Sequence, residues 1–229
     1  MRIEFVNNRQ VITGEGVVAE LGAAVKRLNG TKVFLAVFMP EAECVKTAIK
    51  SLEDENIPYV LYDKIVTEPD LEVIDNGTEL CKAEGCDCVV AIGGGSVIDT
   101  AKAVAIMVTN EGCVEDYQLA KKTFTEKPLA FIAIPTTAGT GAEATKVSVV
   151  LNKRLQWKKA IYSNDMIAQI VLLDPTTTVG LPARATASTG MDAITHAIES
   201  YISLNANTFS KMYSLYALKL LYENIEAAC

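Results

Sequence analysis

The sequence contains a single histidine, and it stands four residues after an aspartate. Asp192 and His196 are one helical turn apart, so on a helix both side chains lie on the same face. A carboxylate and an imidazole in this arrangement can be two ligands of a divalent metal ion. An ordinary hydrogen-bonded Asp–His pair in a protein core has the same spacing, and two ligands do not complete a metal site. The spacing alone leaves both interpretations open.

A glycine-rich segment offers a second kind of chemistry. Gly93-Gly94-Gly95-Ser96 follows the apolar run 88–92 and precedes a helical pattern. Three glycines let a ligand approach the backbone, Ser96 can cap the helix, and the free N–H groups at the helix start favour an anion. We therefore expect a phosphate-binding turn, with a tight strand–helix turn as the alternative. Asp99 and Lys102 are spaced to pair within the first turns of this helix.

Threonines, glycines and alanines gather in the segment 135–143, directly after the apolar run 129–134. On its own this composition is typical of a turn held by threonine hydroxyls. In a parallel sheet, however, ligands bind beyond the carboxyl ends of the strands. Next to the glycine-rich segment, 135–143 is expected to form the second wall of one cleft.

The elements that must position these residues alternate along the chain. Short apolar runs, expected to be buried strands, are separated by helical patterns, which is typical of β–α–β units. The expected strands are 5–6, 10–12, 33–38, 59–62, 88–92, 129–134 and 170–173, together with a hairpin of 147–151 and 159–162 across 152–154. After Leu181-Pro182 only helical patterns remain, at 183–203 and 209–228. The fold class is therefore α/β: a Rossmann-like, mostly parallel sheet with helices on both faces, followed by the start of an all-helical domain. We place the first domain at 1–180 and the second at 181–229.

Composition excludes several classes of function. The chain has 229 residues, half of them hydrophobic, and a formal net charge of −7, which argues against a nucleic-acid partner. No apolar stretch is long enough for a membrane span, so no membrane partner is expected. The first residues lack the apolar core of a signal peptide, and the six cysteines match no zinc-site spacing. We therefore expect a cytoplasmic protein with free thiols.

Four segments, in this order, resemble the iron-containing (group III) alcohol dehydrogenases. They are 93–102 (GGGSVIDTAK), 134–143 (IPTTAGTGAE), Asp174-Pro175 with Leu181-Pro182, and 189–199 (TGMDAITHAIE). The resemblance extends over essentially the whole chain. It implies an N-terminal nucleotide domain, a C-terminal helical domain and transfer of hydride between NAD(P) and a primary or secondary alcohol or aldehyde. A homo-oligomer is expected for the complete protein.

The resemblance also implies a role for individual residues. For the cofactor, NAD or NADP, it implies that the pyrophosphate is held by Gly94, Gly95 and Ser96 and that the groove is lined by Thr136, Thr137 and Thr140, with Lys159 near the cofactor. For catalysis it implies a divalent metal, Fe²⁺ first and Zn²⁺ second, with Asp192 and His196 as two of its four protein ligands.

Two departures from the family pattern bear on this expectation. The family's other two metal ligands are histidines farther along the helical domain, whereas no histidine follows His196 here. Many members end the strand matching 33–37 with an aspartate that accepts the ribose hydroxyls, and this chain has Phe38, which leaves NAD versus NADP open.

The last helical pattern ends within a residue of Cys229 without a stop signal, so we expect either a truncated chain or a partner that covers this helix. Two alternative functions stay open: a nucleotide-binding module without dehydrogenase activity, and a lyase resembling dehydroquinate synthase.

Overall fold

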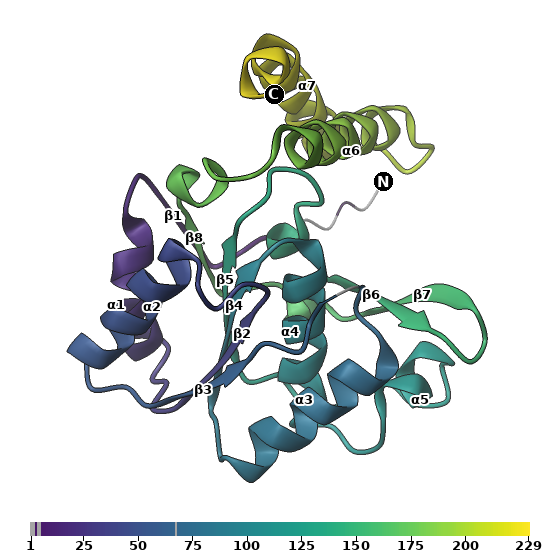
Figure 1. The fold of residues 1–229 in the computed structure, drawn as a ribbon. Helices are drawn as coiled ribbons and strands as arrows, with labels where there is room; N and C mark the ends of the chain where they lie inside the picture. Colours follow the sequence, from purple (N-terminus) through teal and green to yellow (C-terminus); the bar gives the residue numbers. More distant parts are fainter. Residues whose placement is uncertain (1–2, 4–5, 67) are drawn as a thin grey trace. The chain divides into compact units, whose positions relative to one another are not determined.

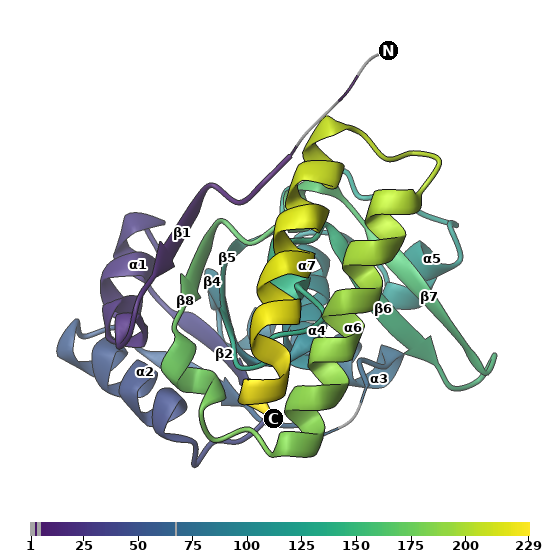
Figure 2. The same cartoon turned by 90° about the horizontal axis from the view of Figure 1, so that it is seen from above.

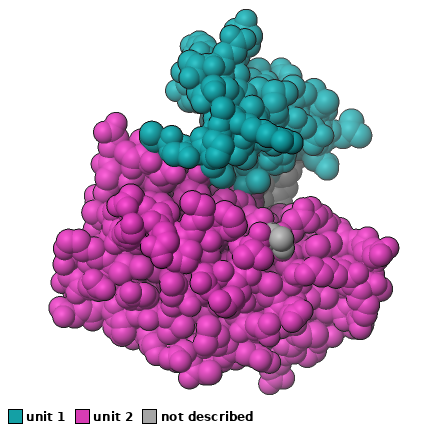
Figure 3. All heavy atoms as spheres, viewed as in Figure 1, with its two compact units in different colours: residues 1–6, 137–141, 178–229 teal, residues 7–136, 142–177 magenta. Residues whose placement is uncertain are grey.

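The computed structural model describes residues 3, 6–66 and 68–229. These residues divide into two compact units, coloured separately in Figure 3. The larger unit comprises 7–136 and 142–177, and the smaller unit comprises 1–6, 137–141 and 178–229. Each unit is described by itself below.

The larger unit is built on a six-stranded sheet in which every pair of neighbouring strands is parallel. The strand order is β1-β8-β5-β4-β2-β3. The strands are β1 (Gln10–Thr13), β2 (Val33–Val37), β3 (Tyr59–Tyr62), β4 (Cys88–Gly93), β5 (Ala130–Pro135) and β8 (Ile170–Leu173). A separate antiparallel hairpin consists of β6 (Val147–Asn152) and β7 (Trp157–Tyr162).

Helices cover both faces of this sheet, as Figure 1 shows. The 3-10 helix η1 (Val17–Glu20) with α1 (Leu21–Arg27) and α2 (Glu43–Asp54) packs on one face, and α3 (Leu71–Ala83) with α4 (Gly95–Met107) packs on the other. The shorter elements are α5 (Val114–Gln118), η2 (Ala142–Ala144), η3 (Asn164–Met166) and η4 (Pro175–Thr178).

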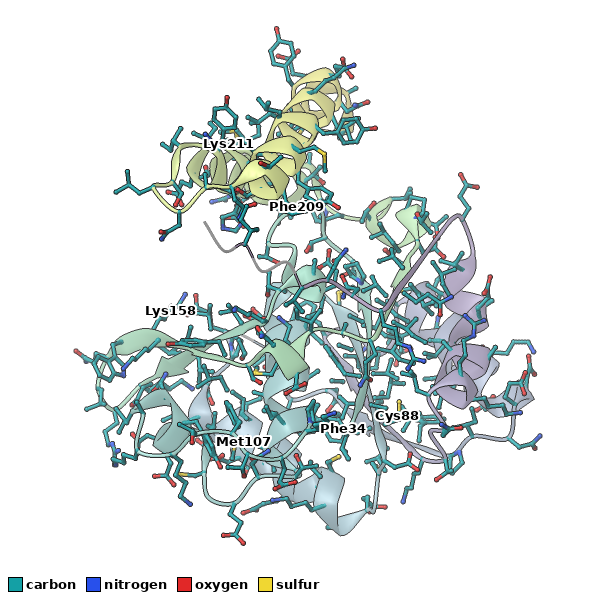
Figure 4. All side chains as sticks on the ribbon, turned by 180° about the vertical axis from the view of Figure 1, so that it is seen from behind. Phe34, Cys88, Met107, Lys158, Phe209 and Lys211 are labelled. Atoms are coloured by element: carbon teal, nitrogen blue, oxygen red, sulfur yellow. The ribbon has the colours of Figure 1, made fainter. Side chains whose placement is uncertain are left out.

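Strand β2 is an example of an apolar run that is buried on both faces of the sheet. All five of its residues are buried, because side chains alternate between the two faces and both faces are covered. Val33, Leu35 and Val37 belong to the core beneath α1 and α2, whereas Phe34 and Ala36 belong to the core beneath α3 and α4. Phe34 is labelled in Figure 4. Each large apolar side chain buried in this way contributes about 1.5–3 kcal/mol to the free energy of unfolding.

The smaller unit contains two long helices, α6 (Ala183–Ile202) and α7 (Thr208–Ala228). They run side by side in Figure 2. They approach closely at Gly190, where an added Cβ would lie 2.7 Å from Cδ1 of Ile225. Asn207 starts α7 with a capping box, in which its side chain accepts from the backbone of Ser210 and the Ser210 hydroxyl accepts from the backbone of Asn207.

The predicted fold class is confirmed, and so are most predicted elements. The strand predicted at 5–6 is an exception: Phe5 lies outside the described residues, and Val6 is in no strand. Strand β1 pairs in parallel with β8, which lies 160 residues later in the sequence, with Gln10 in register with Ile170. All six cysteines are free thiols. No helix among the described residues has the length and apolar content needed to cross a bilayer.

Candidate functional site

The glycine-rich segment lies where the strand order of the sheet reverses. From β2 the chain passes to β3 on one side, and then returns to β4 on the other side of β2. The carboxyl ends of β2 and β4 therefore border the switch point at which parallel α/β sheets bind their ligands. Val37 at the end of β2 is in register with Ile92, and Gly94, Gly95 and Ser96 follow directly after β4.

The first turn of α4 presents uncapped backbone N–H groups. Gly94 is the N-cap residue, with extended φ and ψ, and no side chain caps the helix. The N–H of Val97 donates to the carbonyl of Gly94 at 3.1 Å. The N–H groups of Gly95 and Ser96, which come before it, have no acceptor within an α-helix, so they can bind an anion, which the helix dipole also favours. The prediction that Ser96 caps the helix is wrong. The helix starts two residues earlier than this prediction implies, because Gly94 adopts the cap conformation and Ser96 lies inside the first turn.

Packing against α4 leaves no room for a side chain at Gly93. A Cβ at this position would lie 2.5 Å from Cγ2 and 2.7 Å from Cβ of Val97, which is itself buried in the first turn of α4. The backbone N–H of Thr136 donates to the carbonyl of Gly93 at 3.0 Å. Thr136 therefore lies directly beside the turn, at the carboxyl end of the adjacent strand β5.

The hairpin β6–β7 carries Lys159, with its side chain exposed. The Lys159 ammonium lies 5.4 Å from the ring centroid of Trp157, and the Lys159 carbonyl accepts from Nε2 of Gln118 at 3.2 Å. Lys159 is in register with the buried Val150 and so lies on the same face of the hairpin. Lys158 lies on the opposite face, is paired with Glu68, and is labelled in Figure 4. No interaction between Lys159 and the turn at Gly94–Ser96 is present in the described part of the chain.

The other predicted threonines, Thr137 and Thr140, belong to the smaller unit together with α6. Between them, Gly139 packs directly on that helix. An added Cβ at Gly139 would lie 2.7 Å from Cβ and 2.9 Å from the carbonyl oxygen of Thr189. The segment 137–141 is therefore fixed against α6 at a residue three positions before Asp192.

Asp192 and His196 do lie on one face of α6. Oδ1 of Asp192 and Nε2 of His196 are 3.7 Å apart, and their side chains are 43% and 54% exposed. This distance is too long for a hydrogen bond, so the pair is not the buried Asp–His hydrogen bond that was the alternative interpretation. A divalent ion at about 2.0–2.2 Å from each atom fits between them, because the two bond lengths together exceed the separation.

Within the described part of the chain, these two donors have no third ligand beside them. Among the residues that the structure describes, no group of three or more His, Cys, Asp or Glu side chains is arranged to hold a metal ion. The donor pair therefore fits a divalent metal in chemistry and spacing, and it supplies two of the ligands that a complete site needs.

The sequence interpretation did not select Glu143 as a site residue, although the residue ends the threonine-rich segment. Burial raises the pKa of its carboxyl, and its own backbone N–H and Lys102 only partly oppose this effect. A carboxyl whose pKa is raised by burial, in the short helix η2 at the end of the threonine-rich segment, is a functional candidate. The signal that could have indicated it is its position inside the motif 134–143.

Comparison with known proteins defines the class of protein. The family model described as iron-containing alcohol dehydrogenase matches residues 8–175, and the model for the C-terminal part of the Fe-containing alcohol dehydrogenase family matches residues 186–229. The chain belongs to the iron-containing alcohol dehydrogenase family.

Individual relatives agree with this assignment. A sulfoacetaldehyde reductase of Bilophila wadsworthia is 35% identical over 222 residues, which is 96% of this chain and 57% of that protein. The NAD-dependent methanol dehydrogenase of Bacillus methanolicus is 31% identical over 95% of this chain and 57% of its own length. Among solved structures, a sulfoacetaldehyde reductase of Bifidobacterium kashiwanohense in complex with NAD⁺ superposes with a TM-score of 0.91 at 28% identity, covering 100% of this chain and 61% of that one. The chain thus spans less than two thirds of the length of these relatives.

Proposed function

We propose that the complete protein is a metal-dependent oxidoreductase that transfers hydride between NAD(P) and a primary or secondary alcohol or aldehyde. The observation that carries this proposal is the donor pair on α6, in a chain of the iron-containing alcohol dehydrogenase family. Oδ1 of Asp192 and Nε2 of His196 are separated by a distance that one divalent ion can bridge, and neither atom is used in a hydrogen bond to the other. Two relatives whose names state an aldehyde or alcohol substrate support the substrate class.

Each candidate residue has a part in this proposal. The N–H groups of Gly94, Gly95 and Ser96 bind the pyrophosphate, and the groove beyond it is lined by Thr136, Thr137 and Thr140, with Lys159 near the cofactor. Asp192 and His196 hold the metal, with Fe²⁺ preferred over Zn²⁺. Residues 1–180 form the NAD(P) domain and residues 181–229 the first helices of the metal-binding domain. When bound, the metal would supply a Lewis acid for the substrate oxygen and the dinucleotide would supply the hydride chemistry.

Cofactor preference follows from the residue at the end of β2. Phe38 is 51% exposed and stands where an acidic residue would accept the ribose hydroxyls and repel a 2′-phosphate. We propose that the protein accepts both NAD and NADP. The cytoplasmic location and the homo-oligomer expected from the sequence remain predictions.

The sequence left two alternatives open, a nucleotide-binding module without dehydrogenase activity and a lyase resembling dehydroquinate synthase. The family matches over residues 8–175 and 186–229 support the oxidoreductase over both alternatives.

The metal assignment can be tested on the single histidine. Because the sequence has one histidine, the untagged chain gives one set of imidazole signals in proton NMR. Adding Zn²⁺ should shift these signals in the wild-type chain and much less in Asp192→Ala. Glu223→Ala, which removes an exposed carboxylate paired with Lys219 on α7, is the matched control and should respond like the wild type. Equal responses of the wild type and Asp192→Ala would exclude Asp192 as a ligand.

A further inference from the structure

A fully buried lysine lies two turns after the glycine-rich turn on helix α4. The Lys102 side chain is 0% exposed, and that of its partner Asp99 is 14% exposed, with Nζ and Oδ1 3.2 Å apart. The Asp99–Lys102 pairing predicted from the sequence is confirmed. The pair needs an explanation, because a buried lysine that only fills space is rare.

The ammonium of Lys102 uses all three of its N–H donors. Besides Asp99, it donates to Oγ1 of Thr145 at 3.0 Å and to the carbonyl of Val147 at 2.6 Å. An ammonium has three donors, so no position is left for a ligand. Lys102 therefore does not bind the cofactor itself; it fixes the segment 145–147 against α4.

Asp99 extends the same connection along β6. Its Oδ2 accepts from the backbone N–H of Val149 at 3.0 Å, and its carbonyl accepts from the hydroxyl of Ser148 at 2.8 Å. Three successive residues of β6 are thus attached to two residues of α4. Each bond joins segments that are more than 40 positions apart in the sequence.

Stability alone does not account for a buried pair of this kind. Burial lowers the pKa of the Lys102 ammonium and raises the pKa of the Asp99 carboxyl, and each charge opposes the change in the other. Because of the desolvation penalty, replacing a buried ion pair by apolar residues is often neutral or stabilising. What such a pair provides is a defined position for the parts it connects.

The part that needs a defined position is the hairpin. Strands β6 and β7 form a two-stranded sheet apart from the main sheet, so contacts with neighbouring elements must fix its position. Gln118 of α5 donates to the carbonyls of Val150 and Lys159, whereas Asp99 and Lys102 attach the start of β6 to α4. This hairpin carries Lys159, the proposed cofactor lysine, and α4 carries the proposed pyrophosphate turn in its first residues. The Asp99–Lys102 pair is therefore the polar connection between two parts of the proposed cofactor site.

We propose that Asp99 and Lys102 are positioning residues for NAD(P): the buried pair fixes the β6–β7 hairpin relative to the phosphate-binding turn, and so sets the affinity for the whole dinucleotide. The proposal rests on the proposed function. It implies that a ligand reaching both the turn and the hairpin depends on the pair, whereas a ligand held by the turn alone does not.

The test compares two ligands on matched variants. ADP offers the pyrophosphate turn its diphosphate, whereas NADH also extends to the hairpin. The double variant Asp99→Asn/Lys102→Met removes both charges without leaving one buried and unpaired. We expect its Kd for NADH to rise about 3- to 30-fold, with its Kd for ADP unchanged. Calorimetric titration measures both constants, and Lys50→Met/Asp54→Asn, an exposed pair on α2, is the control that should change neither.

A milder variant keeps the test decisive if the double variant does not fold. Ser148→Ala removes one hydrogen bond to Asp99 and should weaken NADH in the same direction, by a smaller factor. If NADH binds Ser148→Ala and the folded double variant as tightly as the wild type, while their melting temperatures fall, the pair is only structural and the positioning role is refuted. If the wild type binds neither NADH nor ADP, the proposed function itself fails.

Discussion

Replacing Gly93 with alanine tests the proposed phosphate-binding turn, because an added Cβ at Gly93 would clash with Val97 in the first turn of α4. The added methyl group would lie 2.5 Å from Cγ2 of Val97, whereas ordinary contact begins at 3.4 Å, so the methyl is about 0.9 Å too close. Gly93 ends the central strand β4, and Val97 is in the first turn of α4. The strand is held on both sides, so the first turn of the helix has to move.

The expected magnitude has two parts. Overpacking of this kind lowers the free energy of unfolding by about 1–3 kcal/mol. The same shift would displace the N–H groups of Gly95 and Ser96, which we propose bind the pyrophosphate. A hydrogen bond to a charged group contributes about 1.5–3 kcal/mol, so losing one weakens cofactor binding about 10- to 100-fold.

Two measurements separate these effects. Urea unfolding followed by circular dichroism gives the stability, and titration of NADH followed by nicotinamide fluorescence gives the Kd. Gly180→Ala is the matched control, because a Cβ at Gly180 meets nothing within 4 Å. The reasoning is refuted if Gly93→Ala matches Gly180→Ala in both measurements. A loss of stability with an unchanged Kd would keep the packing argument and remove the turn from the cofactor site.

Three further outcomes are expected. The 229-residue chain by itself should show no alcohol-dependent reduction of NAD or NADP with added Fe²⁺ or Zn²⁺, measured at 340 nm. The reason is that no group of three or more His, Cys, Asp or Glu side chains among the described residues is arranged to hold the ion. Clear turnover would contradict this prediction. Phe38→Asp should raise the ratio of the Kd for NADP to the Kd for NAD at least about tenfold, because a carboxylate repels the 2′-phosphate of NADP. Calorimetric titration measures both constants, and an unchanged ratio would place Phe38 outside the ribose site. Asp174 is 3% exposed, and although burial alone raises its pKa, hydrogen bonds from Thr176 and from the backbone of Val18 and Gly16 hold the pKa below its usual value. The ionised Asp174 carboxylate therefore stabilises the fold fully above about pH 4, and this contribution is lost as the pH falls through its pKa in the folded protein. In urea unfolding, Asp174→Asn should lower the free energy of unfolding by about 1.5–3 kcal/mol at pH 7 and by less at pH 3.5. The same difference at both pH values would contradict this prediction.

The strands that the sequence predicted well are those buried on both faces. Runs such as 33–37 and 88–92 are apolar at every position, because helices cover both sides of the sheet. Strand β1 lacks this signal, since it is an edge strand with exposed residues and its partner β8 lies 160 residues away. The short helix Val114–Gln118 was not predicted, because five residues are too few for helical periodicity.

In the candidate site, too, the features that could be predicted are those set by residues close together in the sequence. The glycine turn and the Asp192–His196 spacing are local patterns, and both could be identified from the sequence. The face on which a lysine of the hairpin lies is not local, because it depends on the register. The sequence predicted a turn at 152–154, whereas Asn152 is paired with Trp157 and the loop extends to Gln156, which has φ 52°. Lys158 and Lys159 alternate about this register, so a shift of one residue would exchange their faces.

The threonine-rich segment has contacts beside both the proposed cofactor turn and the proposed metal ligands. The backbone N–H of Thr136 donates to Gly93, beside the glycine turn, and three residues later Gly139 packs on Thr189 of α6. Thr189 precedes Asp192 by less than one turn. A bulky residue at Gly139 should therefore press on the helix that carries the proposed metal ligands. A change at Thr136 should instead act on the strand end next to the proposed phosphate-binding turn. Neighbouring substitutions in one short segment should thus separate metal binding from nucleotide binding.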